Sequence, residues 1–339
     1  MPGFQGPPRA ILLAAVVATA AVDASTAMGA VQAVEGVAIP VTDIDRAARF
    51  YTQVLSFERV ADREVFGEGY EHLYGVFGVR ARAVRLRLGD ETIELVQFLV
   101  PRGRALPEDS RANDRWFQHI AIVVADLDRA YAWLRSRAVE HASTRPQVLP
   151  TWNSSAGGVG AFYFRDSEGN FLEILHFPAD KGDPKWQREQ GRLFLGIDHT
   201  ALVVSDTALS LRYYRDFLGL IVAGKSENYG TEQEHLNNVF GARLRITTLR
   251  ASQGPGIELL EYLTPTTGRA APADTAANDR WQWEVVLRSN DLQAAWRDIR
   301  GARGFPVSPG PIELDGALGA REALLLRDPD GHADLLMSP

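Results

Sequence analysis

The chain of 339 residues contains no cysteine. Disulfide bonds, thiolate metal sites and cysteine nucleophiles are therefore excluded, and a transition metal would need ligands from His, Asp or Glu. An excess of positive charge is also missing, since 36 Lys and Arg stand against 43 Asp and Glu and the formal net charge is −7. Nucleic-acid-binding proteins usually carry a concentrated basic face, so we expect no nucleic-acid partner.

An apolar run at residues 10–22 is too short to span a bilayer comfortably. It follows Arg9 and precedes the small residues of 23–30. A basic start, a short apolar stretch and a small-residue exit are typical of a secretory signal. We predict that residues 1–30 form a signal peptide and leader, and that the mature protein is periplasmic or secreted, with no membrane attachment after cleavage. The alternative is an N-terminal extension that is disordered or helical.

Four blocks of sequence recur at a nearly constant offset of 163 to 165 residues. One clear pair is RFYTQVLSF with RYYRDFLGL, and another is GRALPEDSRANDRW with GRAAPADTAANDRW. A constant offset over several blocks indicates tandem duplication of one structural unit. The repeat predicts two domains at 34–178 and 195–339, with a linker at 179–194.

Each half repeats again, more faintly, as an apolar strand that ends at an Asp before a run with helical spacing. Asp is strongly favoured as the helix N-cap, so these four residues are interpreted as caps and not as catalysts. They are Asp43, Asp126, Asp206 and Asp291. Alternating β-rich stretches follow each helix, which predicts a module of one strand, one helix and about three strands. The four modules cover 34–100, 116–178, 195–264 and 281–338.

These motifs resemble the vicinal oxygen chelate superfamily of glyoxalases, extradiol dioxygenases and fosfomycin and bleomycin resistance proteins. The resemblance is carried by H-x-A-(I/L)-V-V-x-D at 119–126 and 199–206, RYYRDFLGL at 212–220, IEL at 93–95 and 257–259, and RDSEGNFLEI at 165–174. It implies an α+β fold of four βαβββ modules that form two cupped, eight-stranded mixed sheets. It also implies a divalent metal in the cup, held by residues of the first and last strands of each module.

Carried over position by position, the resemblance assigns eight ligand positions, of which six keep a side chain able to bind a metal. The first-strand positions are Gly36, His119, His199 and Glu284. The last-strand positions are Glu94, Glu173, Glu258 and Leu335. Because Gly and Leu offer no ligand atom, at least one site is incomplete.

The pairing of modules decides which ligands meet, and two arrangements are open. If neighbouring modules pair, one cup holds Glu94, His119 and Glu173, and the other holds His199, Glu258 and Glu284. If the second module pairs with the third, one cup contains all of His119, Glu173, His199 and Glu258, and the other keeps only Glu94 and Glu284. We favour the second arrangement slightly, because it gathers the losses in one cup, although the first keeps each duplicated half intact.

Four further residues are candidates for the substrate pocket. His72 and His235 recur in E-H-L-x-x-V-F-G, which predicts a short helix over the cup mouth, although this local pattern favours a packing role. Asn153 lies in a small, polar loop at 152–158 that suits an entrance. Tyr163 would contribute to an aromatic wall.

Two functions compete at this stage. The first is a metal-dependent lyase, isomerase or dioxygenase that chelates two oxygens of a small substrate, with Glu173 or Glu258 moving a proton. The ion would be Zn, Fe, Mn, Ni or Co, since an all-nitrogen-and-oxygen site accepts any of them. The second is a metal-free protein that sequesters an antibiotic-like compound. In either case the partner is a small molecule, and the protein is a monomer or a homodimer.

Overall fold

The computed structural model describes residues 31–188 and 191–339. The predicted signal peptide at 1–30 lies outside the described residues. Within those ranges, no helix has the length and apolar character needed to cross a membrane.

The four predicted modules are present, each opening with a strand and a helix. The first contains β1 (Val31–Pro40), α1 (Ile44–Val54), β2 (Glu58–Phe66), α2 (Glu68–Tyr74), β3 (Arg80–Leu88) and β4 (Glu91–Val100). The second contains β5 (Gln118–Val124), α3 (Leu127–Ser136), β6 (Glu140–His141), β7 (Gln147–Val148), β8 (Gly160–Arg165) and β9 (Phe171–His176). A short 3-10 helix, η1 (Pro184–Gln187), precedes the third.

The second half repeats this order. The third module contains β10 (Phe194–Val204), α4 (Thr207–Leu211), the π-helical turn η2 (Arg212–Phe217), β11 (Ile221–Tyr229), α5 (Thr231–Asn237), β12 (Arg243–Arg250) and β13 (Gly256–Thr264). The fourth contains β14 (Glu284–Ser289), α6 (Leu292–Asp298), β15 (Phe305–Pro306), β16 (Ile312–Glu313), β17 (Glu322–Arg327) and β18 (Ala333–Ser338).

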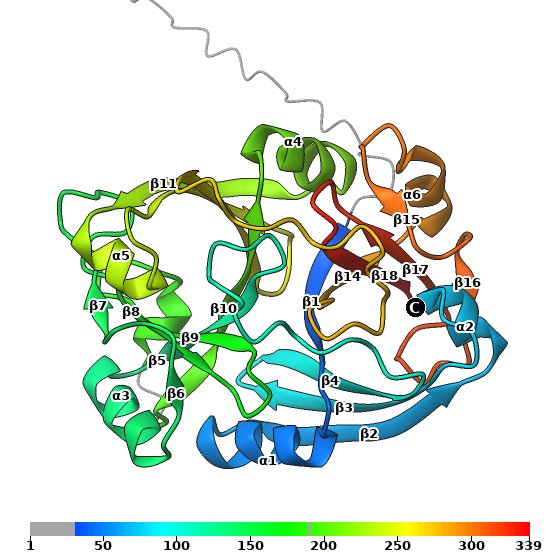
Figure 1. The fold of residues 1–339 in the computed structure, drawn as a ribbon, viewed down its shortest axis with the longest axis horizontal. Helices are drawn as coiled ribbons and strands as arrows, with labels where there is room; N and C mark the ends of the chain where they lie inside the picture. The colour runs from blue at the N-terminus through cyan, green and yellow to red at the C-terminus, as the bar shows by residue number, and fades with distance from the viewer. Residues whose placement is uncertain (1–30, 189–190) are drawn as a thin grey trace, which may run out of the picture.

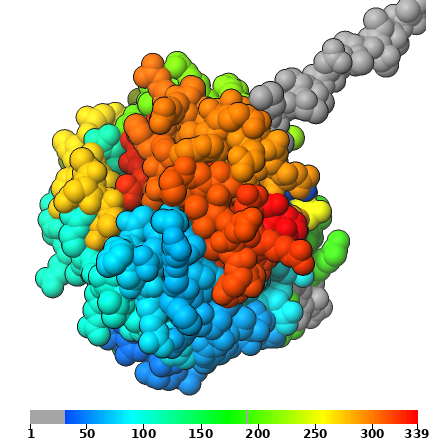
Figure 2. Space-filling view, turned by 90° about the vertical axis from the view of Figure 1, so that its right-hand side faces the viewer, coloured from blue at the N-terminus to red at the C-terminus, as the bar shows by residue number. Residues whose placement is uncertain are grey.

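The modules combine across the two sequence halves. One mixed sheet has the order β15-β17-β18-β14-β1-β4-β3-β2, with β16 on β17, and joins the first module to the fourth. The other has the order β11-β12-β13-β10-β5-β9-β8-β6, with β7 on β8, and joins the second module to the third. We call their concave sides the outer-module cup and the inner-module cup. Each of the halves 34–178 and 195–339 thus contributes one module to each sheet, and blue and orange-red segments from opposite ends of the chain lie side by side (Figures 1 and 2).

Each sheet has nine strands where the resemblance predicts eight. The extra strand arises because the strand after the helix is broken in the second and fourth modules into two-residue pieces, β6 with β7 and β15 with β16. Proline lies in or beside both breaks, at Pro146 and at Pro306, Pro309 and Pro311. Proline lacks the N–H that a continuous ladder needs, so these edges pair only in short segments.

The four predicted N-caps are confirmed. Asp43 accepts a hydrogen bond from the backbone N–H of Arg46, and Asp126 accepts one from that of Arg129. Asp206 and Asp291 make the equivalent bonds at the starts of α4 and α6. Each carboxylate satisfies free N–H groups of the first helical turn, which fixes where each helix leaves its strand.

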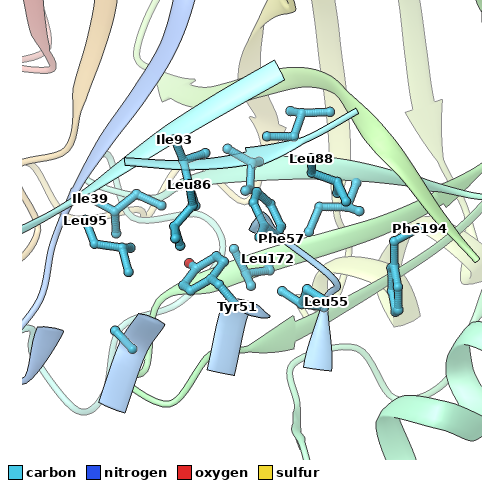
Figure 3. Packing of buried hydrophobic residues seen from close by; sticks show 14 of the residues in the cluster. Ile39, Tyr51, Leu55, Phe57, Leu86, Leu88, Ile93, Leu95, Leu172 and Phe194 are labelled. Carbon is cyan, nitrogen blue, oxygen red and sulfur yellow. The ribbon is translucent and has the colours of Figure 1, made fainter. Parts of the chain in front are cut away.

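A shared apolar core joins the two sheets. Figure 3 shows Tyr51 of α1 and Leu55, directly after α1, against Leu86 and Leu95 of the outer-module sheet. Leu172 of the inner-module sheet belongs to the same cluster. A second cluster joins the sheets on the side of η2 and α6. The helices α1, α3, α4 and α6 therefore support the sheets from their convex sides. The short helices α2 and α5 pack instead against the cup-facing residues.

The two segments that cross between the sheets bind each other reciprocally. The Arg104 guanidinium donates to Asp279, and the Arg269 guanidinium donates to Asp114. Both aspartates lie in the A-N-D-R-W ends of the repeated blocks GRALPEDSRANDRW and GRAAPADTAANDRW. Both carboxylates are almost fully buried, so each needs its arginine.

Candidate functional site

Four strands at the centre of the inner-module sheet position the predicted ligands. β5 runs antiparallel to β10, and each is flanked on its other side by a parallel partner, β9 or β13. In this register Ala201 of β10 lies opposite both His119 and Glu258, and Ala121 of β5 lies opposite both His199 and Glu173. Because side chains alternate along a strand, all four ligand-type residues face the cup.

The ligand atoms converge. His119 Nε2 lies 3.1 Å from Glu173 Oε2, and His199 Nε2 lies 3.7 Å from the same oxygen. One ligand atom from each of these three residues lies within 4.8 Å of the other two, and all three residues are buried. Glu258 is adjacent, with Oε2 at 3.4 Å from His199 Nε2 and Oε1 accepting a 2.8 Å hydrogen bond from the Thr248 hydroxyl.

This donor set fits a divalent cation. Two imidazoles and one carboxylate that share a centre are a common arrangement for ions with open coordination positions. Burying the Glu173 carboxylate without a positive partner would be costly. In the part of the chain that the structure describes, the histidines are its only ion-pairing partners, so its positive partner is either a protonated histidine or a cation bound between the three side chains.

Asp198 is the functional residue that sequence reasoning missed. Its Oδ2 lies 3.0 Å from His199 Nδ1, while its Oδ1 accepts from the Trp186 indole and the Arg250 guanidinium. Strand alternation predicts that neighbouring residues point to opposite faces, but the β10–β5 register shifts between Ile197 and His199, which makes Asp198 part of a β-bulge. The adjacent Asp-His pair was the only signal in the sequence.

The charge environment of His199 follows from these contacts. Burial by itself lowers the pKa of His199, but the Glu258, Asp198 and Glu173 carboxylates together raise it to about 9. Burial raises the pKa of Asp198, yet hydrogen bonding to His199 and the charges of His199 and Arg250 bring it well below its usual range. In the absence of a metal, His199 is therefore protonated at neutral pH and Nε2 donates toward the two glutamates.

A cavity of about 360 Å³ opens over these groups. Its lining includes Glu173, His199 and Glu258 together with Tyr163 and Lys225, and most of the remaining wall is apolar. An apolar pocket with a few convergent polar groups is typical of a small-molecule site. The Tyr163 ring lies 4.9 Å from the His119 ring, and burial together with Glu173 holds the pKa of Tyr163 well above its usual value.

Of the four predicted pocket residues, one lines the cavity and three do not. Tyr163 lines the cavity. His72 is exposed on α2, and His235 is half-buried on α5, where its neighbours Gln233 and Leu236 line the cavity in its place. Asn153 is buried and donates to Asn228, which is a lining residue. The two histidines thus lie outside the cavity wall, and Asn153 supports the wall from behind.

Glu94 and Glu284, also predicted as ligands, lie in the other cup, apart from both histidines. Arg63 donates to both oxygens of Glu94 at 2.5 and 2.7 Å, and Arg85 donates to it at 3.2 Å. Burial, with a smaller contribution from Glu94, raises the pKa of Glu284 to about 8. The arginines occupy the lone pairs that a metal would need, so among residues 31–188 and 191–339 the outer-module cup has no comparable donor set.

Gly36 closes its ligand position sterically. Its φ is +146°, and a Cβ there would lie 2.0 Å from the backbone carbonyl oxygen of Thr92. No side chain fits at this separation, so a histidine at this position is excluded by the backbone.

Comparisons with known proteins agree with this fold. A family model described as the Glyoxalase/Bleomycin resistance protein/Dioxygenase superfamily matches residues 33–174 and 196–333. A 2-epi-5-epi-valiolone epimerase from an Actinomyces species is 33% identical over 167 residues, which cover 48% of this chain and 87% of the relative. Crystal structures of glyoxalase I from Zea mays and of one of its mutants have TM-scores of 0.59 and 0.62, at 15% and 16% identity; each covers 91% of this chain and 92% of the maize chain.

The maize structures are too distant in sequence to show more than the fold. The family model, in contrast, covers both sequence halves and includes the positions of His119, Glu173, His199 and Glu258. The chain belongs to the Glyoxalase/Bleomycin resistance protein/Dioxygenase superfamily.

Proposed function

We propose that the inner-module cup is the active site of a divalent-metal-dependent enzyme that moves a proton on a small, oxygen-bearing substrate. The observation that carries the proposal is the convergence of His119, Glu173 and His199 on one buried centre. Bound there, a divalent ion supplies a positive charge that stabilises negative charge developing on a substrate oxygen.

His119, Glu173 and His199 would hold the ion, and the structure favours three protein ligands over four. The Glu173 carboxylate faces both histidines, whereas Glu258 contacts only His199 of the three. Three protein ligands leave coordination positions for two substrate oxygens.

Glu258 is the better candidate for the proton-transfer group. Its side chain is 20% exposed, against 6% for that of Glu173, and it lines the cavity. The Thr248 hydroxyl fixes Oε1 and leaves Oε2 to accept a proton from a carbon next to the chelated oxygen. If Glu258 returns this proton to a neighbouring atom of the substrate, the result is an isomerisation without a net change in composition. Epimerisation would instead need a proton delivered to the opposite face of the same carbon by a second group or by water, while Glu258 keeps the proton that it removed until solvent takes it.

The relative from Actinomyces supports this class of reaction, since it is named as an epimerase. The compound in its name, 2-epi-5-epi-valiolone, is therefore a suitable first probe. Solvent exchange in D₂O, followed by proton NMR, detects reversible proton abstraction even when no net product accumulates.

The proposal is tested first by metal analysis of the purified protein. We expect about one equivalent of a transition metal, lost in His119→Ala and retained in His72→Ala, which removes an exposed imidazole from outside both cups. Glu258→Gln should keep the metal and lower the exchange rate at least a hundredfold, which is the usual contribution of a positioned base. Absence of metal together with tight binding of a small apolar compound would favour sequestration instead.

Secretion is proposed on the sequence of residues 1–30 alone. Cell fractionation combined with N-terminal sequencing of the mature protein tests it. Cleavage after Ala24 or Ala27 is expected, and an intact N-terminus in the cytosolic fraction would contradict it.

A further inference from the structure

The outer-module cup is closed to metal but is not filled. A cavity of about 280 Å³ remains between β1, β4, β14 and β18 and the segment at 318–320. It is a second, separate cavity at the position equivalent to the active-site cup. Its charged lining side chains are Glu35, Arg85, Glu94 and Arg288, and Pro339, which carries the terminal carboxylate, also lines it.

Two arginines stand where the other cup has small hydroxyl residues. In the inner-module sheet Thr248 lies opposite Glu258 and bonds to it, and in the outer-module sheet Arg85 occupies the same register opposite Glu94. Arg63, on the neighbouring strand, also pairs with Glu94. In the inner-module cup several ligands would share one divalent cation. In the outer-module cup two guanidinium groups pair with the single carboxylate of Glu94.

The charges at this wall pair unevenly. Glu35 and Arg288 form an ion pair and offset each other. Glu94 is shared by Arg63 and Arg85, so it offsets the Arg85 guanidinium only in part, and the described residues show no ion pair between Arg85 and the Pro339 carboxylate. Any attraction for an anion therefore comes from Arg85 itself and not from a net charge of the cavity, and partial shielding from water strengthens it.

Arg85 is held in place and presents an open edge. Its Nη2 donates to Glu94 and to the Leu318 carbonyl, and no other hydrogen bond from it occurs among residues 31–188 and 191–339. Gly319, at φ +83°, would place a Cβ 3.5 Å from Nη1, so the absence of a side chain leaves that edge uncovered. The guanidinium therefore keeps free donors beside the cavity in a fixed orientation.

The rest of the wall suits an apolar body. It is formed by Val37, Ile93, Val286, Leu318, Ala320 and Met337. A guanidinium fork matches the geometry of a carboxylate, which it binds through two parallel hydrogen bonds. We propose that the outer-module cup binds a small organic carboxylate, with Arg85 holding the carboxylate and the apolar wall holding its carbon skeleton. This site is independent of the metal proposed for the other cup.

Three probes are used: benzoate, its neutral analogue benzyl alcohol, and inorganic phosphate. Isothermal titration of the full protein, before and after treatment with EDTA, should show benzoate binding that survives chelation and exceeds that of benzyl alcohol at least tenfold. Survival after chelation separates this site from the metal cup, so the two proposals fail independently. Tighter binding of phosphate than of benzoate would overturn the assignment to a carboxylate.

Arg85→Thr installs the residue found at the equivalent position of the other cup, and we expect it to weaken benzoate binding at least tenfold. Arg82→Thr is the matched control, because it removes the same charge from the same strand, where the Arg82 side chain pairs with Asp62 outside the cavity. If Arg85→Thr does not fold, Arg85→Lys keeps the charge but loses the fork, and it should still weaken binding several-fold. No benzoate binding by the wild type, or an equal loss in Arg82→Thr, would overturn the proposal.

Discussion

Replacing Asp198 by Asn tests how the protein orients its proposed metal ligands. Asp198 holds the Nδ1 side of His199 at 3.0 Å and is itself fixed by Trp186 and Arg250. Asn keeps the size of the side chain and an oxygen acceptor but removes the charge. Loss of such a partner typically weakens metal binding 10- to 100-fold, which corresponds to about 1.4–2.7 kcal/mol.

A second effect of the same substitution acts in the opposite direction. The pKa of His199 is raised to about 9 in the metal-free protein, so binding a metal at neutral pH must displace a proton. Between pH 7 and 9 this competition weakens the affinity of the wild type by roughly tenfold per pH unit below the pKa. Removing the Asp198 charge lowers the pKa of His199 and relieves part of the competition.

The two effects separate with pH. Zinc affinity, measured against a competing chelator, should rise with pH in the wild type and level off near pH 9, whereas Asp198→Asn should level off earlier. The deficit of the variant should therefore be larger at pH 9.5 than at pH 7. Equal affinity of the two proteins at pH 9.5, or a deficit that does not change with pH, would refute the role assigned to Asp198.

Three further predictions concern stability. Arg269→Ala leaves the buried Asp114 carboxylate without its guanidinium and should lower the free energy of unfolding by roughly 2–4 kcal/mol. Arg102 is an exposed residue of the other crossing segment, and Arg102→Ala should change the free energy of unfolding by less than about 0.5 kcal/mol. Burial raises the pKa of Glu284 to about 8, so the folded state retains a proton that the unfolded chain releases, and stability should fall as the pH rises from about 4.5 to about 8. Urea titrations should show Glu284→Gln lacking that decline and exceeding the wild type by up to roughly 3–5 kcal/mol at pH 9, with little difference at pH 4. Gly36→His should unfold or strongly destabilise the protein without adding a metal equivalent, and a stable variant with extra metal would contradict the steric reasoning.

The sequence was sufficient for the modules and the helix caps, and it selected four residues that lie together in one cup, because each depends on local chemistry or on the repeat. Asp43 and its three counterparts are caps because a carboxylate before an amphipathic run satisfies free N–H groups. His119, Glu173, His199 and Glu258 could be assigned because the repeat places equivalent residues on equivalent strands, whichever modules pair.

Module pairing could not be settled from the sequence, since either arrangement gives each apolar strand a partner. It depends on long-range contacts such as the β1–β14 and β5–β10 ladders. Asp198 was missed for a different reason. A β-bulge breaks the alternation of side chains on which strand reasoning rests, and nothing in the residues around Asp198 marks the bulge.

Arg63 and Arg85 were also overlooked, because a search for metal ligands does not consider cations. Their importance emerges only when the register places Arg85 opposite Glu94. Nothing in the sequence around these arginines indicated that they are the partners of the buried Glu94 carboxylate.

The most direct test of the central claim is anomalous X-ray diffraction from crystals of the purified protein, collected on both sides of the absorption edge of the metal found by elemental analysis. We predict one anomalous peak between His119 Nε2, His199 Nε2 and the Glu173 carboxylate, and no peak at Glu94. A peak at any other position, or none at that centre in protein grown with excess transition metal, would contradict the account.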